Sequence, residues 1–351
     1  MMKNRIAWLD IAKGIAILSM IVGHIVSWNP IGKIIFSFHM PLFFIVAGYT
    51  AKKEFSMKSF WKMVSRILVP YLSFCLIYGI INILSGQSNI QTELLRILWG
   101  SGVSGEYGPG VPVFGNGTIP TIGVLWFLPT LFFSKLFFTA FLKVSDSWHV
   151  WFQAGGALII CALGYMLGQR YKLPLNIDMV PFVLIFFYAG FLFKKYDGIN
   201  KSSVSLGAIL MVLWYMALKC DGIELSARYY RSFPACIFSI AGAIAATFCV
   251  IYFSNEVVQK IKVLNTFLTF CGKHSLAILC IHFMERYSNF DIVSTYFTNH
   301  LGLGTFTQEI LFSIIRVTFC VSVCYLYTLI LGAYKTFKSK KSALNCPERR
   351  A

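Results

Sequence analysis

The sequence predicts an all-α fold: a polytopic transmembrane helical bundle of about ten spans, with both chain termini in the cytoplasm. The first reason is composition, because 57% of the 351 residues are hydrophobic and 13% are charged, whereas soluble domains contain about 25% charged residues. The second is that apolar runs recur at about 20 residues each, the length at which a helix crosses a bilayer. The third is an uneven distribution of Lys and Arg between alternate loops.

The predicted spans follow one another along the whole chain, so we expect a single integral membrane domain over residues 1–351. The first span contains charged residues and is not followed by a small-residue cleavage site, so we interpret it as a retained helix and not as a signal peptide. The sixth span is short and fits a tilted or re-entrant path. The ten segments are 6–27, 34–51, 67–84, 123–142, 149–168, 180–194, 203–219, 232–254, 265–284 and 307–333.

The formal net charge of +17 would suggest a nucleic-acid partner in a soluble protein. Here we attribute it to cytoplasmic loops, where Lys and Arg accumulate, and we expect no nucleic-acid binding. With the N-terminus inside, the predicted cytoplasmic segments contain 20 Lys and Arg residues and the outer segments 8. The remaining three, Lys13, Lys135 and Arg316, fall inside spans, and residues 334–351 form a basic cytoplasmic tail.

Two loops have distinctive compositions. Residues 53–66 mix aromatic side chains with Lys58, Lys62 and Arg66, a pattern typical of a helix that lies in the cytoplasmic interface. That helix could anchor the protein to anionic membrane lipid or cradle an anionic cofactor. Residues 85–122 form the longest predicted outer loop, whose Gly and Pro content argues against regular structure over much of it. Long loops of this kind often act as lids or binding loops.

The ten cysteines do not suggest a redox or metal function. Most of them lie within apolar runs, where Cys behaves as a small apolar side chain. Cys320 and Cys324 are four residues apart on one predicted helix, but no second Cys or His pair accompanies them. We therefore predict neither a disulfide framework nor a metal site.

Three histidines and one tryptophan are predicted to reach a common depth near the outer face. A titratable side chain in hydrocarbon costs at least ~2.5 kcal/mol on insertion scales, so its presence needs a reason. His24 lies near the outer end of the first span, His39 near the outer start of the second and His282 near the outer end of the ninth. Trp126 begins the fourth span at the same level. This convergence predicts an active site there.

One face of the first span combines a cation and an imidazole. At 100° per residue, His24 and Lys13 differ by about 20° around the helix, and Asp10 lies about 60° from Lys13. Lys13 lies about 16 Å below His24 at 1.5 Å per residue. That spacing suits a long ligand that enters from the cytoplasm with its anionic part low and its reactive end high.

The same residues also have structural interpretations. Membrane histidines can form hydrogen bonds that hold helices together. Asp10 and Lys13, three residues apart on one helix, could simply neutralise each other. Arg316 could pair with Glu309 or Glu285, either as a structural ion pair or as part of a substrate contact.

Five motifs resemble, in order along the chain, those of the acyltransferase 3 family. Members of that family are bacterial membrane O-acyltransferases that modify surface polysaccharides. Lys13 and His24 match the family pattern of Arg or Lys, ten residues, then His. The resembling segments are LDIAKG (9–14) with GH (23–24), FHMPLFF (38–44) with GY (48–49), RILVPY (66–71), WFLP (126–129) and GKHSL (272–276) running to His282.

The resemblance implies ten or more helices in the bacterial cytoplasmic (inner) membrane. Some members add an extracytoplasmic hydrolase-like domain, which we do not expect from this sequence. It implies acyl-CoA, most often acetyl-CoA, as the acyl donor and a surface or lipid-linked glycan as the acceptor. It also implies that His24 is the catalytic base and that Lys13 and Arg66 contact the donor. The Phe-His-Met-Pro sequence around His39 is similar to that of members acting on fucose and common-antigen sugars.

The chemistry of these side chains fits that role. A sugar hydroxyl is a poor nucleophile until a base takes its proton, and the imidazole of His24 titrates near neutrality. The phosphates of CoA need cations near the cytoplasmic face, which Arg66, Lys58 and Lys62 supply, and Arg can bind phosphate with two parallel hydrogen bonds.

The remaining candidates have subsidiary roles. Asp10 and Trp126 are assigned to substrate binding, Trp126 by packing against the pantetheine arm or the sugar ring. His39 and His282 could orient His24 or stabilise the oxyanion.

We expect direct transfer, in which the sugar attacks the thioester beside His24. In the competing mechanism, the acyl group is first bound to a histidine before the sugar arrives. The alternative function is a glycan transporter or flippase without transferase chemistry, a class that commonly contains internal repeats; we detect none. Four points stay open: which sugar is the acceptor, which of its hydroxyls is modified, whether the acyl group is acetyl or longer, and whether the protein is a monomer or a homo-oligomer.

Overall fold

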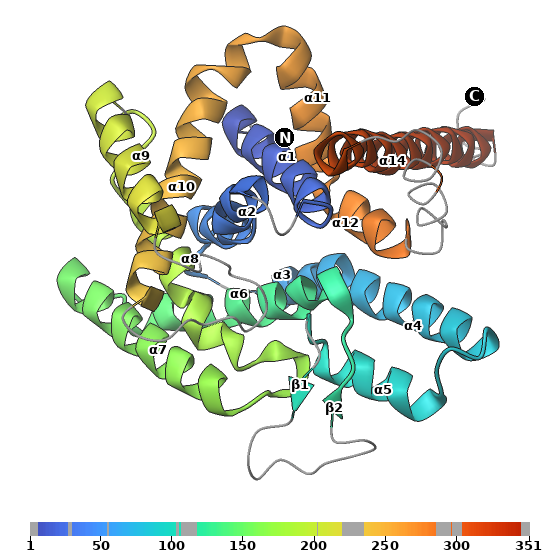
Figure 1. Ribbon diagram of the computed structural model, residues 1–351, viewed down its shortest axis with the longest axis horizontal. Helices are drawn as coiled ribbons and strands as arrows, with labels where there is room; N and C mark the ends of the chain where they lie inside the picture. The colour runs from blue at the N-terminus through green and yellow to red at the C-terminus, as the bar shows by residue number, and fades with distance from the viewer. Residues whose placement is uncertain are drawn as a thin grey trace, which may run out of the picture. The chain divides into compact units, whose positions relative to one another are not determined.

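The computed structural model describes residues 6–26, 30–54, 56–102, 105–106, 118–201, 203–219, 235–285, 296 and 304–344. The chain forms two compact units, Met1–Ser275 and Leu276–Ala351, each with its own internal packing. The described chain is almost wholly helical (Figure 1), which confirms the predicted all-α class. Its one sheet is a two-stranded antiparallel pair of two residues each, β1 (Gly105–Glu106) and β2 (Thr118–Ile119).

The helices follow the order of the predicted spans. Those up to the boundary between the two units are α1 (Ala7–Gly23), α2 (Pro30–Tyr49), α3 (Met57–Met63), the π-helix η1 (Val64–Leu68), α4 (Val69–Leu84), α5 (Ile90–Trp99), the 3-10 helix η2 (Gly123–Trp126), α6 (Phe127–Val144), α7 (Val150–Arg170), η3 (Pro174–Asn176), α8 (Met179–Lys195), α9 (Val204–Lys219), α10 (Ala235–Glu256), η4 (Val258–Lys260) and α11 (Lys262–Lys273). Then follow α12 (Ser275–Met284) and α14 (Thr305–Leu344).

Seven helical segments are long and apolar enough to cross a bilayer, so the chain is a polytopic membrane protein. The pair α11 and α12 passes the same test as a broken span, α9 is a shorter apolar helix, and α1 has 17 residues. All ten predicted spans coincide with a helix or with this broken pair, and the count of ten stays a prediction. The seven are Pro30–Tyr49, Met57–Leu84, Gly123–Val144, Val150–Arg170, Pro174–Lys195, Cys236–Lys260 and Thr305–Lys338.

Several helices expose large apolar side chains. Leu76 on α4, Ile159 on α7 and Ile209 on α9 are each more than half exposed. In water such surfaces would be unfavourable, whereas lipid solvates them, and a helix satisfies its own backbone hydrogen bonds in hydrocarbon. These faces are therefore the lipid-facing surface of the protein.

The interior of the first unit is built around α2 and α8, whose apolar side chains are mostly buried. The two helices pack closely because each has a glycine at the contact. A Cβ added to Gly48 would overlap the carbonyl of Phe187, and one added to Gly190 would overlap the carbonyl of Ile45. Small residues at helix crossings are the usual way in which membrane helices approach closely.

A second close contact joins α1 to α11, which lie side by side (Figure 1). A Cβ on Gly14 would overlap the carbonyl of Leu268, and a Cβ on Gly272 would overlap the carbonyl of Asp10. The backbone beside Lys13 therefore packs directly against α11. Two glycines of the motifs identified in the sequence thus have a packing role.

Two predicted segments near the C-terminus differ in detail from the structure. The ninth predicted span, 265–284, is not one helix, because His274 has φ −108° and ψ 16°, outside the helical region, between α11 and α12. The helix of the last span, α14, has 40 residues and continues to Leu344, so the first part of the predicted tail 334–351 is helical, and residues 345–351 lie outside the described residues. No Gly or Pro lies between Ala333 and Leu344 to end the helix.

One of the two distinctive loops, 85–122, is more helical than predicted. In 85–122, α5 is capped at its start by Asn89, whose Oδ1 accepts the Thr92 N–H at 2.9 Å, and it ends at Gly100 with φ +59°. The glycines and prolines that argued against structure begin only at residue 100. In 53–66, the predicted helix forms as α3 and η1, which continue into α4 as one segment.

Contacts between loops agree with the prediction that successive loops alternate between the two sides of the membrane. Lys53 pairs with Asp146, and both lie in loops predicted to be cytoplasmic. On the opposite side, the indole N–H of Trp99 donates to the carbonyl of Lys172 at 3.2 Å, and both lie in predicted outer loops.

Candidate active site

Asp10 and Lys13 form an ion pair on α1, with Lys13 Nζ 2.7 Å from Asp10 Oδ1. Their side chains are 9% and 21% exposed. They lie at positions i and i+3, beside the contact between α1 and Gly272 of α11. The pair is therefore in the protein interior, and the neutralising contact allowed by the sequence is formed.

His24 caps the C-terminus of α1 and is exposed. Its backbone N–H donates to the carbonyl of Met20 at 3.2 Å, which continues the helical pattern to this residue. Its ring packs edge-on against Phe36 of α2 with a centroid distance of 6.0 Å. Phe36 also contacts His39 at 5.2 Å, so the two histidines share one aromatic neighbour.

His39 is buried in α2, and its Nδ1 lies 3.0 Å from the carbonyl oxygen of Ile35. A carbonyl oxygen only accepts hydrogen bonds, so this contact places the N–H on Nδ1 and leaves Nε2 as the acceptor nitrogen. Because α2 begins at Pro30, earlier than predicted, His39 lies in the middle of the helix and not near its start.

Two cations lie within electrostatic range of a third, Lys135, on another element. The charges of Lys13 on α1 and Arg66 on η1 both act on the ammonium group of Lys135 on α6. The packing of Phe60 on α3 against Phe132 on α6, with a centroid distance of 6.0 Å, brings these elements together one turn from Lys135. We call Lys13, Arg66 and Lys135 the cation cluster.

The cation cluster has an excess of positive charge. Within the described part of the chain, Asp10 is the carboxylate that pairs with it, through Lys13, and neither Arg66 nor Lys135 has an acidic partner there. Cations in membrane helices are unfavourable unless an anion or water offsets them. The cluster therefore suits a ligand with several negative charges. Sequence reasoning did not include Lys135 because its proximity depends on how α6 packs.

Lys58 and Lys62 lie on α3, which Ser56 caps by accepting the Ser59 N–H at 3.2 Å. Both lysines are exposed, one helical turn apart, on the segment that leads to Arg66. No acidic side chain among the described residues pairs with them. They extend the positive charge from the cation cluster toward the exposed end of this helix.

Trp126 ends the 3-10 helix η2 and is buried. Its ring is nearly perpendicular to that of Phe127 at 6.3 Å, and Phe127 packs in turn against Phe43 and Phe44 of α2 at 5.5 and 5.3 Å. The indole is therefore held at the junction of α2 and α6.

Four polar side chains meet in the second unit, at the end of α12 and on α14. Nδ1 of His282 lies 2.8 Å from Oε1 of Glu285. Nε of Arg316 donates to the same oxygen at 2.5 Å, and the thiol of Cys320 donates to Oε2 at 3.0 Å. Of the two acids considered as partners of Arg316, it is Glu285 and not Glu309 that makes this contact.

His282, Glu285 and Cys320 place three potential metal ligands within 4.8 Å of one another. The guanidinium of Arg316, however, contacts the carboxylate where a metal ion would bind. Two positive charges on one carboxylate oxygen would repel each other. We therefore interpret the group as a network of hydrogen bonds and charges.

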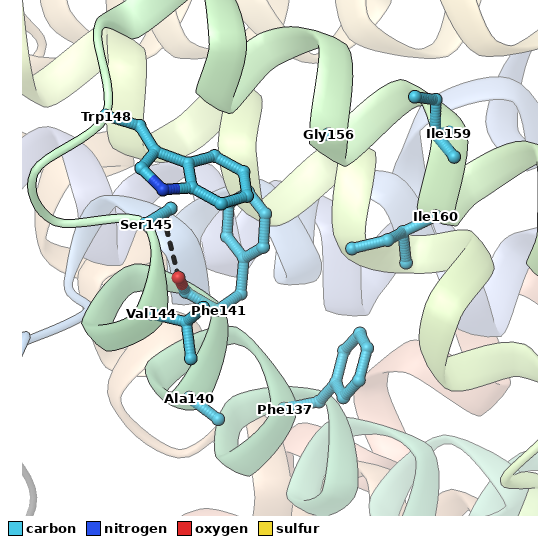
Figure 2. A pocket seen from close by; sticks show the side chains of 9 residues that line it. All are labelled: Phe137, Ala140, Phe141, Val144, Ser145, Trp148, Gly156, Ile159 and Ile160. Carbon is cyan, nitrogen blue, oxygen red and sulfur yellow. Dashed lines mark hydrogen bonds between the residues drawn. The ribbon is translucent and has the colours of Figure 1, made fainter.

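A cavity of about 410 Å³ lies between α6 and α7 of the first unit (Figure 2). Its lining includes the indole of Trp148 and the hydroxyl of Ser145, which already donates to the carbonyl of Phe141 at 2.7 Å. An apolar lining of this kind suits a hydrocarbon chain and not a charged donor. The lining residues are Phe137, Ala140, Phe141, Val144, Ser145, Trp148, Gly156, Ile159 and Ile160.

Comparison with known proteins gives one family and two relatives. A family model described as an acyltransferase domain matches residues 6–331. The chain is 27% identical over 238 residues to the nodulation protein NolL of Sinorhizobium fredii, across 62% of this chain and 57% of that protein. It is 28% identical over 120 residues to NolL of Mesorhizobium japonicum, across 27% of this chain and 32% of that protein. The chain thus spans about half the length of the first relative and about a third of the second. No solved structure matches.

Proposed function

Because this chain belongs to the acyltransferase 3 family, whose model matches residues 6–331, we propose that it is a membrane-embedded O-acyltransferase. It moves an acetyl group from cytoplasmic acetyl-CoA to a sugar hydroxyl of a surface or lipid-linked polysaccharide. Its location is the bacterial cytoplasmic membrane, where donor and acceptor are on opposite sides.

The observation that supports this proposal most directly is the cation cluster. Lys13, Arg66 and Lys135 belong to membrane-embedded elements and outnumber their one described counter-ion, Asp10. The phosphates of CoA supply the negative charge that such a group needs, and Arg66 can bind a phosphate with two parallel hydrogen bonds. A neutral sugar substrate alone would not require this arrangement.

The exposed lysines of α3 and the ion pair of Asp10 with Lys13 complete the donor site in this proposal. Lys58 and Lys62 attract the nucleotide part of the donor, and Arg66 and Lys13 bind its phosphates. Asp10 holds Lys13 in place through their ion pair. From Lys13 the pantetheine arm extends along α1 to His24 at the C-terminal end of that helix. The distance from Lys13 to His24 along the helix is about 16 Å at 1.5 Å per residue.

His24 acts as the general base at that end of α1. Its imidazole takes the proton of the sugar hydroxyl as the oxygen attacks the thioester carbonyl carbon. A C–O bond forms, the C–S bond breaks, and the proton passes to the sulfur of the departing CoA. His39, which shares Phe36 with His24, helps to orient the base or stabilises the oxyanion, and Trp126 packs against the substrate.

The test uses purified full-length protein, radiolabelled acetyl-CoA and membrane vesicles that carry the host's surface glycan. We expect label in the glycan and none retained on the protein. Stable label on the protein without glycan would replace direct transfer by an acyl-enzyme route. Absence of transfer under any acceptor condition would refute the enzymatic proposal.

The alternative, a glycan transporter or flippase, predicts a different phenotype. Deleting a transporter removes the glycan from the surface, whereas deleting an O-acetyltransferase leaves the glycan in place without its acetyl groups. Mass analysis of surface glycan from wild-type and deletion strains separates the two, and it reports the acyl group and the acceptor sugar at the same time.

A further inference from the structure

We propose that the cavity between α6 and α7 binds one acyl chain of an anionic phospholipid. The headgroup of that lipid lies at the loop between the two helices, beside Trp148 and Lys143. The inference rests on the membrane location of the chain and not on its enzymatic activity.

The cavity follows one face of each helix (Figure 2). On α6, Phe137, Phe141 and Val144 follow one another at intervals of four and three residues, so they share a face. Gly156 and Ile160, four residues apart on α7, belong to the other wall. From Phe137 to Val144 the cavity follows α6 for about 10 Å at 1.5 Å per residue. Its volume of about 410 Å³ lies within the range of about 300–1,000 Å³ that is typical of small-molecule sites.

Gly156 keeps the cavity open. A Cβ added at this position would lie 3.3 Å from the indole ring of Trp148 and 3.7 Å from the ring of Phe141, so a larger side chain would occupy the space that these residues line. The adjacent Gly155 differs, since a Cβ there meets nothing within 4 Å. The two glycines are therefore a cavity position and an open position, side by side on one helix.

The cavity opens on the surface that faces lipid. Three of its own lining residues, Phe137, Val144 and Ile159, are exposed apolar side chains. The medium at such a surface is the hydrocarbon of the bilayer, and an apolar cavity offers too few polar partners to hold water. An acyl chain of a neighbouring lipid can therefore enter the cavity from the side.

Hydrogen bonds hold the loop at one end of the cavity in place. The hydroxyl of Ser145 donates to the carbonyl of Phe141 at 2.7 Å, and Nε2 of Gln153 on α7 donates to the carbonyl of Ser145 at 2.6 Å. The backbone N–H of Trp148 donates to that same carbonyl at 3.0 Å. Because the loop is fixed in this way, the cavity is formed before a ligand arrives, and binding costs less ordering of the protein.

The polar lining residues lie at this one end. Trp148 is exposed there, and Trp is typical of the boundary between hydrocarbon and headgroups. Lys143 is exposed and directly precedes the lining residue Val144, so its long side chain can reach the headgroup of a lipid in the cavity. Lys53 pairs with Asp146 of the loop, which leaves Lys143 without an acidic partner among the described residues.

These features select an amphiphile. The apolar walls suit a hydrocarbon chain, and the uncompensated charge of Lys143 at one end suits a negative headgroup. The loop belongs to the face predicted to be cytoplasmic, where anionic lipids meet basic loops. A second copy of this chain is the alternative occupant, because α7 also exposes Trp151 and Phe152, but an apolar helix face would leave Lys143 without a counter-charge.

The test of the headgroup is native mass spectrometry of the full-length protein, released from detergent micelles. The probes are phosphatidylglycerol and phosphatidylcholine with identical acyl chains. We expect wild-type protein to bind one phosphatidylglycerol with a Kd about fivefold lower than for phosphatidylcholine, the preference that one lysine near a negative headgroup provides. Lys143→Gln should remove this preference and leave the Kd for phosphatidylcholine unchanged. A preference that survives in Lys143→Gln would overturn the inference.

The test of the chain site compares the two glycines. Gly156→Leu should raise the Kd for both lipids about tenfold, the loss expected when about two methylene groups are no longer buried. Gly155→Leu, the matched control, should stay within about twofold of wild type. Equal binding by the two variants would refute the cavity as the site. Should Gly156→Leu not accumulate as folded protein, Ala140→Phe fills the same cavity from α6 and has the same expected result.

The same spectra distinguish the alternative occupant. If wild-type protein and Gly155→Leu form a dimer that Gly156→Leu does not form, and lipid binding is the same in all three, a second copy occupies the cavity and the inference is refuted. No step of this experiment measures acetyl transfer. Its failure is therefore distinguishable from failure of the proposed function.

Discussion

Arg66 of η1 and Lys135 of α6 are like charges close enough to act on each other across two membrane-embedded elements. They lie 69 positions apart in the sequence, and the contact between Phe60 and Phe132 brings their elements together. Two cations are not held together in hydrocarbon without compensation. Arg66 is exposed, so water or an anionic group can offset these charges, and the phosphates of an anionic donor would do so.

Lys135→Met should weaken donor binding. Removing one charge-assisted contact to a phosphate should raise the KM for acetyl-CoA about tenfold, equivalent to about 1.4 kcal/mol, with little change in the maximal rate. Steady-state kinetics with a truncated donor, S-acetyl-pantetheine, should show no such increase, because that donor lacks the phosphates. Lys143→Met, an exposed lysine on the same helix, is the control. Equal effects on both donors would contradict the assignment of Lys135 to phosphate.

His24→Ala should abolish transfer without removing the protein from the membrane. Loss of a general base lowers the rate about 10²–10⁴-fold, and His24 lies at the end of α1 and is exposed, so the helix should persist. The measurement is surface glycan acetylation at equal protein levels. His149→Ala, at the exposed start of α7, should leave acetylation unchanged. Normal acetylation in the His24 variant would remove that residue from the mechanism.

Gly272→Val should destabilise the first unit. Any Cβ at this position overlaps the carbonyl of Asp10, and overpacking a tight interior typically costs about 1–3 kcal/mol. We expect a lower midpoint of thermal unfolding in detergent and a loss of donor binding, because Lys13 lies beside the contact. Gly155→Ala on α7, where a Cβ meets nothing within 4 Å, is the control. Wild-type stability of Gly272→Val would show that α1 and α11 are not in backbone contact.

The ion pair on α5 should stabilise the fold at neutral pH and lose its effect in acid. Burial acts to raise the pKa of Glu93, but hydrogen bonds from Arg96 and Asn82 outweigh it, so the pKa lies below its ordinary value. A lowered folded-state pKa stabilises the protein above the unfolded value of about 4.3, and the effect disappears as pH falls through the folded value. The unfolding midpoint of Glu93→Gln should therefore lie below that of wild type at pH 7 and approach it as pH falls below about 4. A constant difference would refute this linkage.

The sequence by itself determined the membrane class, the order of the helices and the motifs of the family. These depend on local properties: apolar runs of membrane length, charge bias between loops, and short spacings such as that from Lys13 to His24. The same local patterns did not predict α5. The glycines and prolines that argued against regular structure in that loop lie beyond the C-terminal end of α5. It also placed His39 near a helix start, because the apolar run begins later than the helix.

Only the tertiary structure decided which polar groups meet. Lys135 joins Lys13 and Arg66 because α6 packs on the α3–η1 segment, and Glu285 was one of two equal candidates for Arg316 until the contact was seen. Side-chain spacing within one helix is fixed by its 3.6-residue period, so it can be read from sequence. Contacts between helices depend on crossing points, and glycines such as Gly14 and Gly272 set these only once their partners are known.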